Sequence, residues 1–435
     1  LTLNVAPGAI VIGLQIFAGH VEILYYCLMV AAGYAGWRLP TLKFGAARQP
    51  WSAVLLRALA MLGVPVFGMA LGAVQFLPLY ELASTSFRDG RASYQQVLDW
   101  SLPARQILVF LVPNLYGHSS HHVYFNWFTR AWTPALAAND TIDWSLKNSV
   151  ESGAYLGLLP LMLAVVAVRR WWRNRPFGGR IDWLFSPWPF FVLLALISLA
   201  FAFGTPLYAL IFWLPGISQL HSPFRWVFPL SLAVAALAAY GLDGLLPGER
   251  DETGKVPRSY HAQRIWGTPD LVAAAAILSG VLCLIWLAVM YLRFDLFDSM
   301  LEDQLHDLAR ASDAFCTGTL PVLHCDTRMF LSYVGTWIGA FAGIAIASGL
   351  ALLSRHVQYA WRGRPLWVIG LGAVLAFDLM LAAWGFAPAA DPSVLSAVPP
   401  SAAFLKQDQS LWRMTTYTPG NQTSPYHANI PWLFG

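Results

Sequence analysis

A histidine and a glutamate lie two residues apart near the start of the chain, in Gly19-His20-Val21-Glu22. They stand where a short apolar piece meets a longer apolar segment, so we expect them at a membrane boundary. An imidazole and a carboxylate this close can act as an acid/base pair or as two ligands. At a wet boundary they can equally be simple interface residues, and both interpretations stay open.

Two arginines are candidates for binding a phosphate group. Pro78 is expected to end a helix, so that Glu81 and Arg88 emerge just above the apolar layer. Arg225 opens a later apolar segment, where its charge adds to the positive end of the helix dipole. A guanidinium fork suits phosphate. Alternatively, Arg88 pairs with Glu81 at the surface, and Arg225 reaches out to lipid phosphate.

The remaining candidates are more ambiguous. Glu151 directly precedes an apolar segment, as a base or as a dipole partner of a helix. The histidines of Tyr116-Gly117-His118-Ser119-Ser120-His121-His122 are a weak metal pattern, and no metal site is predicted from them. Tyr116 and Tyr208 are further site candidates. Asp378 lies near the middle of the apolar segment 366–387, where an ionisable group marks function or hydrogen bonds to a neighbouring helix.

The composition restricts the elements that can position these residues. Only 11% of the 435 residues are charged and 57% are hydrophobic, whereas a soluble chain carries about a quarter charged residues. This excludes an ordinary soluble enzyme, and the 20 Trp, 16 Tyr and 26 Phe residues exclude disorder. The chain is predicted to be an all-α polytopic membrane protein.

Eight segments are apolar enough to form transmembrane helices, which need about 20 such residues. Two shorter pieces, residues 9–18 and 207–215, could be halves of a kinked pair or re-entrant segments. The prediction is therefore about eight to ten transmembrane helices. The eight segments are residues 23–37, 53–78, 153–168, 189–204, 226–246, 271–292, 330–353 and 366–387.

The distribution of charge predicts the orientation of these helices. Basic residues are enriched on the cytoplasmic side, and one alternating path through the eight segments collects 16 of the 27 basic residues on one side, with six acids. The other side holds 11 basic and 17 acidic residues. The basic run from Arg169 to Arg180 then reads as a topology signal beside lipid headgroups, and no nucleic-acid partner is predicted.

The outer side receives the long segments of the chain. These are loops 82–152, 205–225 and 293–329, and everything after Pro388. Cys316 and Cys325 lie on this oxidising side, where a local disulfide is expected; two free thiols are the alternative. We expect a multi-helix transmembrane domain over residues 1–390 and the start of an extracytoplasmic C-terminal segment over 391–435.

Several short strings, in this order, resemble the bacterial YfhO-like membrane-protein family. The resemblance covers most of the chain, and its weight lies in the order of the strings because each is short. The strings are Phe17-Ala18-Gly19-His20, Gln75-Phe76-Leu77-Pro78 through Ser86 and Arg88, Pro113-Asn114-Leu115-Tyr116-Gly117, residues 151–160 from Glu151 to Pro160, Thr205-Pro206-Leu207-Tyr208, Pro223-Phe224-Arg225, Gly241-Leu242-Asp243, Asp378-Leu379, and Trp412-Arg413 toward Asn429.

That family resembles the multi-pass glycosyltransferases of the GT-C fold. The resemblance implies a GT-C-like protein with long extracytoplasmic loops in the bacterial plasma (inner) membrane. Its partners would be membrane lipids, a polyprenyl-phosphate-linked sugar as donor and an envelope glycan or lipid as acceptor. It also implies a catalytic Asp in the first outer loop, upstream of His20. We read both ends of the chain as cuts in a longer protein, so this Asp is expected before residue 1.

Glycosyl transfer from a phosphate carrier needs a carboxylate to activate the acceptor hydroxyl and cations to stabilise the leaving phosphate. Glu22, Glu81 and Glu151 are the visible carboxylates, and Arg88 and Arg225 are the cations. No cofactor is predicted with certainty, and a divalent metal remains compatible with these residues.

Two other classes of protein stay open. The chain can be a non-catalytic structural or accessory subunit of a larger membrane complex, with membrane-protein partners. A transporter or flippase is the third alternative, but it needs several polar residues lining a path through the membrane, and Asp378 alone is thin support for one.

Overall fold

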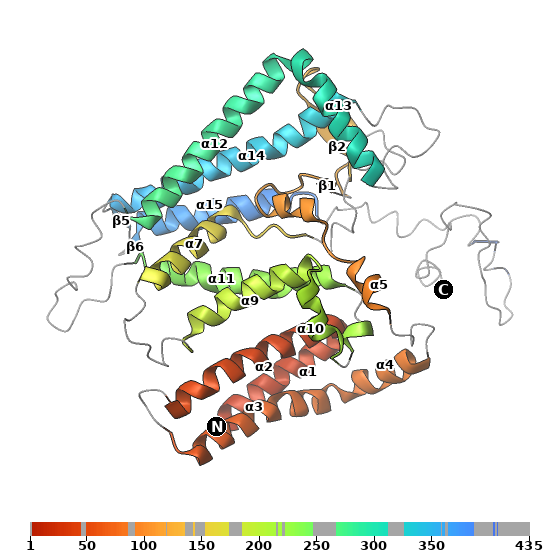
Figure 1. Cartoon of the computed structure of the whole chain (residues 1–435), viewed down its shortest axis with the longest axis vertical. Helices are drawn as coiled ribbons and strands as arrows, with labels where there is room; N and C mark the ends of the chain where they lie inside the picture. Colours follow the sequence, from red (N-terminus) through yellow and green to blue (C-terminus); the bar gives the residue numbers. More distant parts are fainter. Residues whose placement is uncertain are drawn as a thin grey trace. The chain divides into compact units, whose positions relative to one another are not determined.

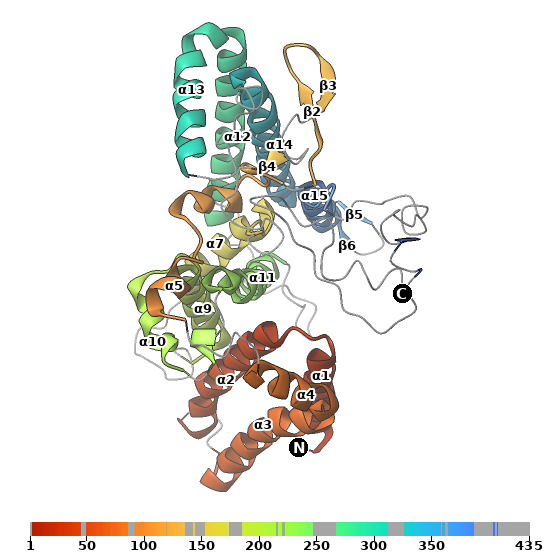
Figure 2. The ribbon, with the colours of Figure 1, turned by 90° about the vertical axis from the view of Figure 1, so that its right-hand side faces the viewer.

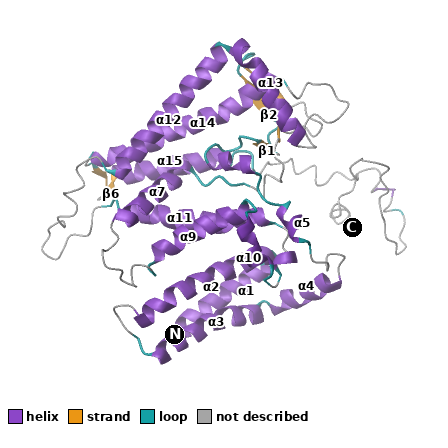
Figure 3. Ribbon diagram, viewed as in Figure 1, coloured by secondary structure: helices purple, strands orange, loops and turns teal. Residues whose placement is uncertain are grey.

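A computed structural model shows a chain built mainly of helices (Figures 1 and 3). It divides into two units, residues 1–384 and 385–435, and the features below belong to the first. The structure describes residues 2–44, 49–85, 92–118, 120–134, 142–143, 153–173, 185–214, 216–219, 222–246, 267–311, 326–357, 359–361, 364–386, 403–404 and 407.

The α-helices follow one another along the chain with short 3₁₀ turns and small strands between them. The α-helices are α1 (Thr2–Phe17), α2 (Val21–Phe44), α3 (Trp51–Leu71), α4 (Ala73–Thr85), α5 (Tyr94–Leu98), α7 (Leu158–Arg173), α9 (Pro187–Ala202), α10 (Ala209–Phe212), α11 (Val227–Asp243), α12 (Thr268–Leu292), α13 (Phe294–Ala311), α14 (Thr327–Leu353) and α15 (Leu366–Ala382). The 3₁₀ turns are η1 (Ala104–Phe110), η2 (Pro206–Tyr208), η3 (Ile217–Gln219), η4 (Pro223–Trp226) and η6 (Ser354–His356).

The strands form three small antiparallel pairs. β1 (Gly117–His118) pairs with β4 (Ile142–Asp143), β2 (Val123–Asn126) with β3 (Ala131–Pro134), and β5 (Ala360–Trp361) with β6 (Arg364–Pro365).

Four of the described helices are long and apolar enough to cross a membrane: Trp51–Leu71, Pro223–Asp243, Thr268–Leu292 and Thr327–His356. A fifth span is possible if Pro187–Ala202 and Pro206–Phe212, which meet at a bend of 103°, count as one. The chain is thus a largely helical, multi-pass membrane protein.

All eight predicted segments are helical in whole or in part, but three of these helices fall outside the length and composition limits for a span. Helix α7 has 16 residues and ends in arginines, α15 has only 17 residues, and α2 carries Glu22, Arg38 and Lys43. Whether these three cross the membrane stays a prediction.

Two predicted boundaries were wrong. The segment 53–78 is not one helix, because the chain breaks at Gly72 and resumes as α4. A Cβ at Gly72 would meet the side chain of Ile16 at 2.6 Å, so the close approach of α1 requires a glycine there. Pro78 does not end a helix: it lies inside α4, which carries Glu81 and continues to Thr85.

Small residues let α12 and α14 lie against each other, in the most extensive helix pair of the described chain. A Cβ added to Gly280 of α12 would lie 2.6 Å from the carbonyl oxygen of Ala342 on α14. A Cβ added to Gly349 of α14 would lie 2.7 Å from the carbonyl oxygen of Ala273 on α12. Close backbone approach through small residues is typical of helix pairs in membranes.

We therefore expect Gly280→Ala to lower the free energy of unfolding by about 1–3 kcal/mol, because the clash is with backbone and forces the helices apart. Gly343→Ala is the matched control on α14, since nothing lies within 4 Å of its Cβ position. It should be neutral or stabilise by up to about 1 kcal/mol. Unfolding by SDS titration in micelles measures both, and equal stability of the two variants would contradict the packing.

Candidate functional site

Glu22 and Arg225 form an ion pair, although they are far apart in the sequence. Glu22 lies in the first turn of α2, where a carboxylate interacts favourably with the helix dipole. Arg225 lies in η4, the 3₁₀ turn that leads into α11. Arg225 Nη1 donates a hydrogen bond to Glu22 Oε2, and Glu22 is only 7% exposed. This pair joins α2 to the start of α11, at ends that are predicted to face outward.

Aromatic side chains surround the pair. The Tyr26 hydroxyl donates to Glu22 Oε1 at 2.9 Å, one helical turn after Glu22, and the Tyr26 ring lies 5.1 Å from that of Trp226 between centroids. Tyr208 is fully buried in the same hydrophobic cluster. Its hydroxyl has no hydrogen-bond partner among the described residues. A buried polar group without a partner is costly, and both the Tyr208 hydroxyl and the Trp226 indole N–H have unused hydrogen-bonding capacity among the described residues.

His20 directly precedes α2, the helix that carries Glu22. Its Nδ1 accepts a weak hydrogen bond of 3.4 Å from the backbone N–H of Ile23, so it helps to satisfy the first turn of α2. His20, Glu22, Tyr208 and Arg225 are therefore the predicted site residues that the structure brings into one region.

Tyr116 belongs to a different set of contacts. Its hydroxyl donates to the carbonyl oxygen of Arg105 at 3.1 Å, and the Arg105 guanidinium lies 5.2 Å from the centre of its ring. Burial raises the pKa of the Tyr116 hydroxyl and lowers the pKa of Arg105. This phenol stays protonated at neutral pH and holds its own loop together.

Several other candidates are placed less informatively. Glu81 is exposed on α4. Arg88, Glu151, Cys316 and Cys325 lie outside the described residues, so the second phosphate-binding candidate, the third carboxylate and the expected disulfide stay predictions.

Asp378 is buried and engaged with the segment before α7. Its Oδ1 accepts a 2.5 Å hydrogen bond from the Tyr155 hydroxyl, and its Oδ2 accepts one of 3.0 Å from the backbone N–H of Leu158. Because α15 ends at Ala382, Asp378 lies near the end of its helix and not at its middle. The carboxylate caps the first N–H of α7, which favours the structural interpretation of this residue.

The histidine-rich loop packs on α14. His121 Nδ1 lies 2.6 Å from the Tyr333 hydroxyl, and its ring stacks on Trp337 at 5.7 Å between centroids. Burial lowers the pKa of His121, so it is neutral at pH 7. His118 Nδ1 lies 2.6 Å from the Ser120 hydroxyl. Within the described part of the chain, no three His, Cys, Asp or Glu side chains gather as a metal ion would require.

One polar cluster was missed in the sequence. Asp270, at the first turn of α12, pairs with Arg355 at 2.6 Å and with His356 at 2.7 Å, both just after α14. Its Oδ2 also accepts from the backbone N–H of Gly267 at 2.8 Å. The sequence did contain a signal for this cluster. Asp270 precedes one apolar segment, and Arg355 and His356 follow the next one. All of these groups lie on the predicted inner side, where they tie α12 to α14.

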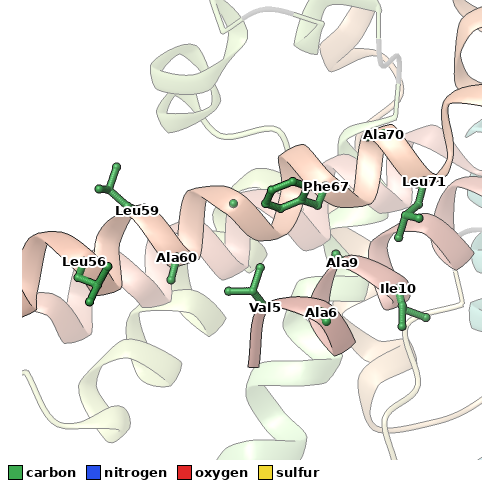
Figure 4. A pocket seen from close by; sticks show the side chains of 11 residues that line it. Val5, Ala6, Ala9, Ile10, Leu56, Leu59, Ala60, Phe67, Ala70 and Leu71 are labelled. Atoms are coloured by element: carbon green, nitrogen blue, oxygen red, sulfur yellow. The ribbon is translucent and has the colours of Figure 1, made fainter. Parts of the chain in front are cut away.

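An apolar cavity of about 710 Å³ lies between α1 and α3 (Figure 4). Its lining includes Val5 and Ile10 of α1 and Leu56 and Phe67 of α3, and no polar side chain contributes to it. It offers no group for acid/base chemistry, so the Glu22–Arg225 region is the better candidate for a reactive site.

These helices and the buried ion pair define the class, a helical multi-pass membrane protein with a polar cluster at one end of its helices. No family model, curated protein or solved structure matches the chain. The resemblance to the YfhO-like family therefore stays a prediction.

Proposed function

We propose that the chain is an integral membrane glycosyltransferase of the GT-C type. It would move a sugar from a polyprenyl-phosphate carrier to an envelope glycan or lipid acceptor on the outer face of the bacterial plasma membrane. The observation that carries the proposal is the contact between Glu22 and Arg225, a carboxylate and a guanidinium held together in a largely buried, aromatic surrounding.

Each half of this pair fits one requirement of the reaction. Arg225 supplies a cation for the phosphate that leaves the sugar, and low exposure strengthens this interaction because the local dielectric constant is low. Glu22 holds the guanidinium in place and offers a carboxylate for the acceptor hydroxyl. Tyr208 adds a hydroxyl with free hydrogen-bonding capacity beside them.

Hydrogen bonds between distant segments support the outward placement of this region. The Trp37 indole N–H donates to the carbonyl oxygen of Ser186 at 3.0 Å, and the Arg38 guanidinium donates to that of Phe185 at 2.7 Å. All four residues are near the predicted inner side. On the predicted outer side, Asn114 Nδ2 donates to the Ala382 carbonyl oxygen at 3.1 Å. Segments assigned to the same side thus contact each other, which favours the alternating path.

The same ion pair supports one alternative. In this alternative Glu22 neutralises Arg225, and the pair has a purely structural role: it fastens α2 to α11 in a non-catalytic subunit of a membrane complex. A transporter receives less support, because the buried Asp378 carboxylate is already engaged by Tyr155 and Leu158.

We expect Arg225→Ala to lower sugar transfer by a factor of about 100 or more, since removing one group that stabilises developing charge has effects of this size. Transfer is measured in membrane vesicles with a radiolabelled polyprenyl-phosphate sugar, and insertion by the amount of protein in the membrane. Arg328→Ala is the control, an exposed arginine that lies over Phe128. Unchanged transfer in the inserted Arg225 variant would remove Arg225 from the site and favour the accessory role.

A further inference from the structure

In the β2–β3 hairpin (Figure 2), buried and exposed residues alternate along β2, while β3 is exposed at three of its four positions. Tyr124 and Asn126 are 7% and 8% exposed. On the alternate positions, Val123, Phe125 and Trp132 are 53%, 38% and 71% exposed. Phe125 and Trp132 are directly paired across the strands, with ring centroids 5.7 Å apart. The exposed face is therefore an apolar, largely aromatic surface on a predicted outer loop.

The turn of the hairpin is fixed to the two longest membrane-spanning candidates. The backbone N–H of Trp127 donates to Ser332 Oγ, and its indole N–H donates to Thr336 Oγ1, both at 3.2 Å. Tyr291, near the end of α12, donates its hydroxyl to the Trp127 carbonyl oxygen at 3.4 Å. These bonds set the height of the hairpin relative to α12 and α14.

That height corresponds to the membrane boundary. Helix α14 has 27 residues, so it is about 40 Å long and exceeds a hydrocarbon layer of about 30 Å by about 5 Å at each end. Ser332 and Thr336 lie about 8 and 14 Å along α14 from Thr327 at a rise of about 1.5 Å per residue. Ser332 and Thr336 therefore lie about 3 and 9 Å inside the outer limit of the hydrocarbon layer, and Trp127 is held within about 10 Å of that limit.

We propose that the exposed face of this hairpin, Val123, Phe125 and Trp132, binds the outer leaflet of the lipid bilayer at the boundary between headgroups and acyl chains. Trp is enriched at this level because its ring is apolar and its N–H is polar. Arg130, exposed in the hairpin turn, lies two residues from Trp132 and supplies a cation for lipid phosphate. The hairpin would then anchor the outer loop to the membrane, whatever reaction the protein performs.

Lipid fits this face better than a carbohydrate chain. The three exposed side chains have one polar atom between them, the Trp132 indole nitrogen. A sugar site needs several placed polar groups beside its stacking ring to fix orientation. Trp286, Val289 and Leu292 of α12 are also exposed, near the end of that helix where Tyr291 bonds to the hairpin turn.

The test places a fluorophore on the hairpin of the full chain in phosphatidylcholine/phosphatidylglycerol vesicles. Trp132→Cys is made in a background in which Cys27, Cys283, Cys316 and Cys325 are replaced by Ser, and is labelled with a polarity-sensitive dye. Val289→Cys on α12 is the lipid-exposed reference, and Gln95→Cys on α5 is the water-exposed reference. Quenching is measured with headgroup-spin-labelled lipid and with aqueous iodide.

We expect headgroup-spin-labelled lipid to quench the dye at position 132 at least about twofold more than the dye at position 95, as an interfacial position requires. Iodide should quench it less than position 95. Quenching by iodide equal to that at position 95 would overturn the proposal. So would protection from iodide that appears only when soluble envelope oligosaccharide is added, because that result assigns the face to carbohydrate. Val123→Cys, a smaller change on the same face, gives the same readout if Trp132→Cys does not fold.

Discussion

Replacing Arg225 by Met is expected to lower the free energy of unfolding by about 3 kcal/mol, because it leaves the buried Glu22 carboxylate without its cation. Glu22→Gln should have a similar cost, since it leaves the guanidinium without its anion. The double variant should be less destabilised than the sum of the two single variants by about 2 kcal/mol. SDS titration of the purified protein measures all four proteins of this cycle.

The side chains of Arg225 and Glu22 are only 18% and 8% exposed, which is why the pair should behave unlike a surface ion pair. Gln95→Ala is the control, because it removes an exposed 3.1 Å hydrogen bond to Asp99 and should change stability by less than about 0.5 kcal/mol. Strictly additive effects in the cycle would show that the two charges do not interact and would contradict the geometry.

The same cycle separates the two proposed roles of the pair. If the pair only fastens α2 to α11, any sugar transfer that the single variants lose returns in the double variant together with stability. If Arg225 binds the donor phosphate, the double variant regains stability but transfers no sugar. Stability and transfer therefore have to be measured on the same preparations.

The helices were largely predictable because long apolar segments dominate this sequence. Burial of apolar residues in a membrane depends on composition over about 20 residues, and that is visible without a structure. Interruptions were less predictable. The chain breaks at Gly72, where the close approach of Ile16 on α1 leaves no room for a Cβ. Helix α4 continues through Pro78, and neither outcome is visible in the local sequence.

The sequence predicted which residues belong to the candidate site, but not that they contact one another. An arginine on the acidic side and a glutamate at a helix start could be singled out, but their contact joins residues 203 positions apart. No spacing rule reaches that far. Tyr26 had a local signal, since it follows Glu22 by one helical turn. In β2, the alternation Val123-Tyr124-Phe125-Asn126 predicts a half-buried strand, but it predicts the wrong buried face: Tyr124 and Asn126 are buried and Val123 and Phe125 are exposed.

Asp378 provides the second large expected effect. Asp378→Ala should lower the free energy of unfolding by about 3 kcal/mol, because it leaves the Tyr155 hydroxyl and the Leu158 N–H without their acceptor. Gly157 has a positive φ of 85°, and an added Cβ there would lie 3.4 Å from Asp378 Oδ2. The turn before α7 is thus shaped closely around this carboxylate, with little room for a replacement partner.

Tyr155→Phe distinguishes this capping role from a role in proton or substrate movement. Combined with Asp378→Ala, it removes one of the two orphaned groups, so the double variant should lose less stability than the two single effects added together. Asp378→Asn keeps an acceptor oxygen and should cost less than Asp378→Ala. SDS titration gives these energies, and sugar transfer in membrane vesicles gives the second readout. Because the carboxylate acts as an acceptor in this role and not as a charge, Asp378→Asn should retain transfer in proportion to the folded protein. Complete loss of transfer in a folded Asp378→Asn variant would contradict the capping role and assign Asp378 to the reaction.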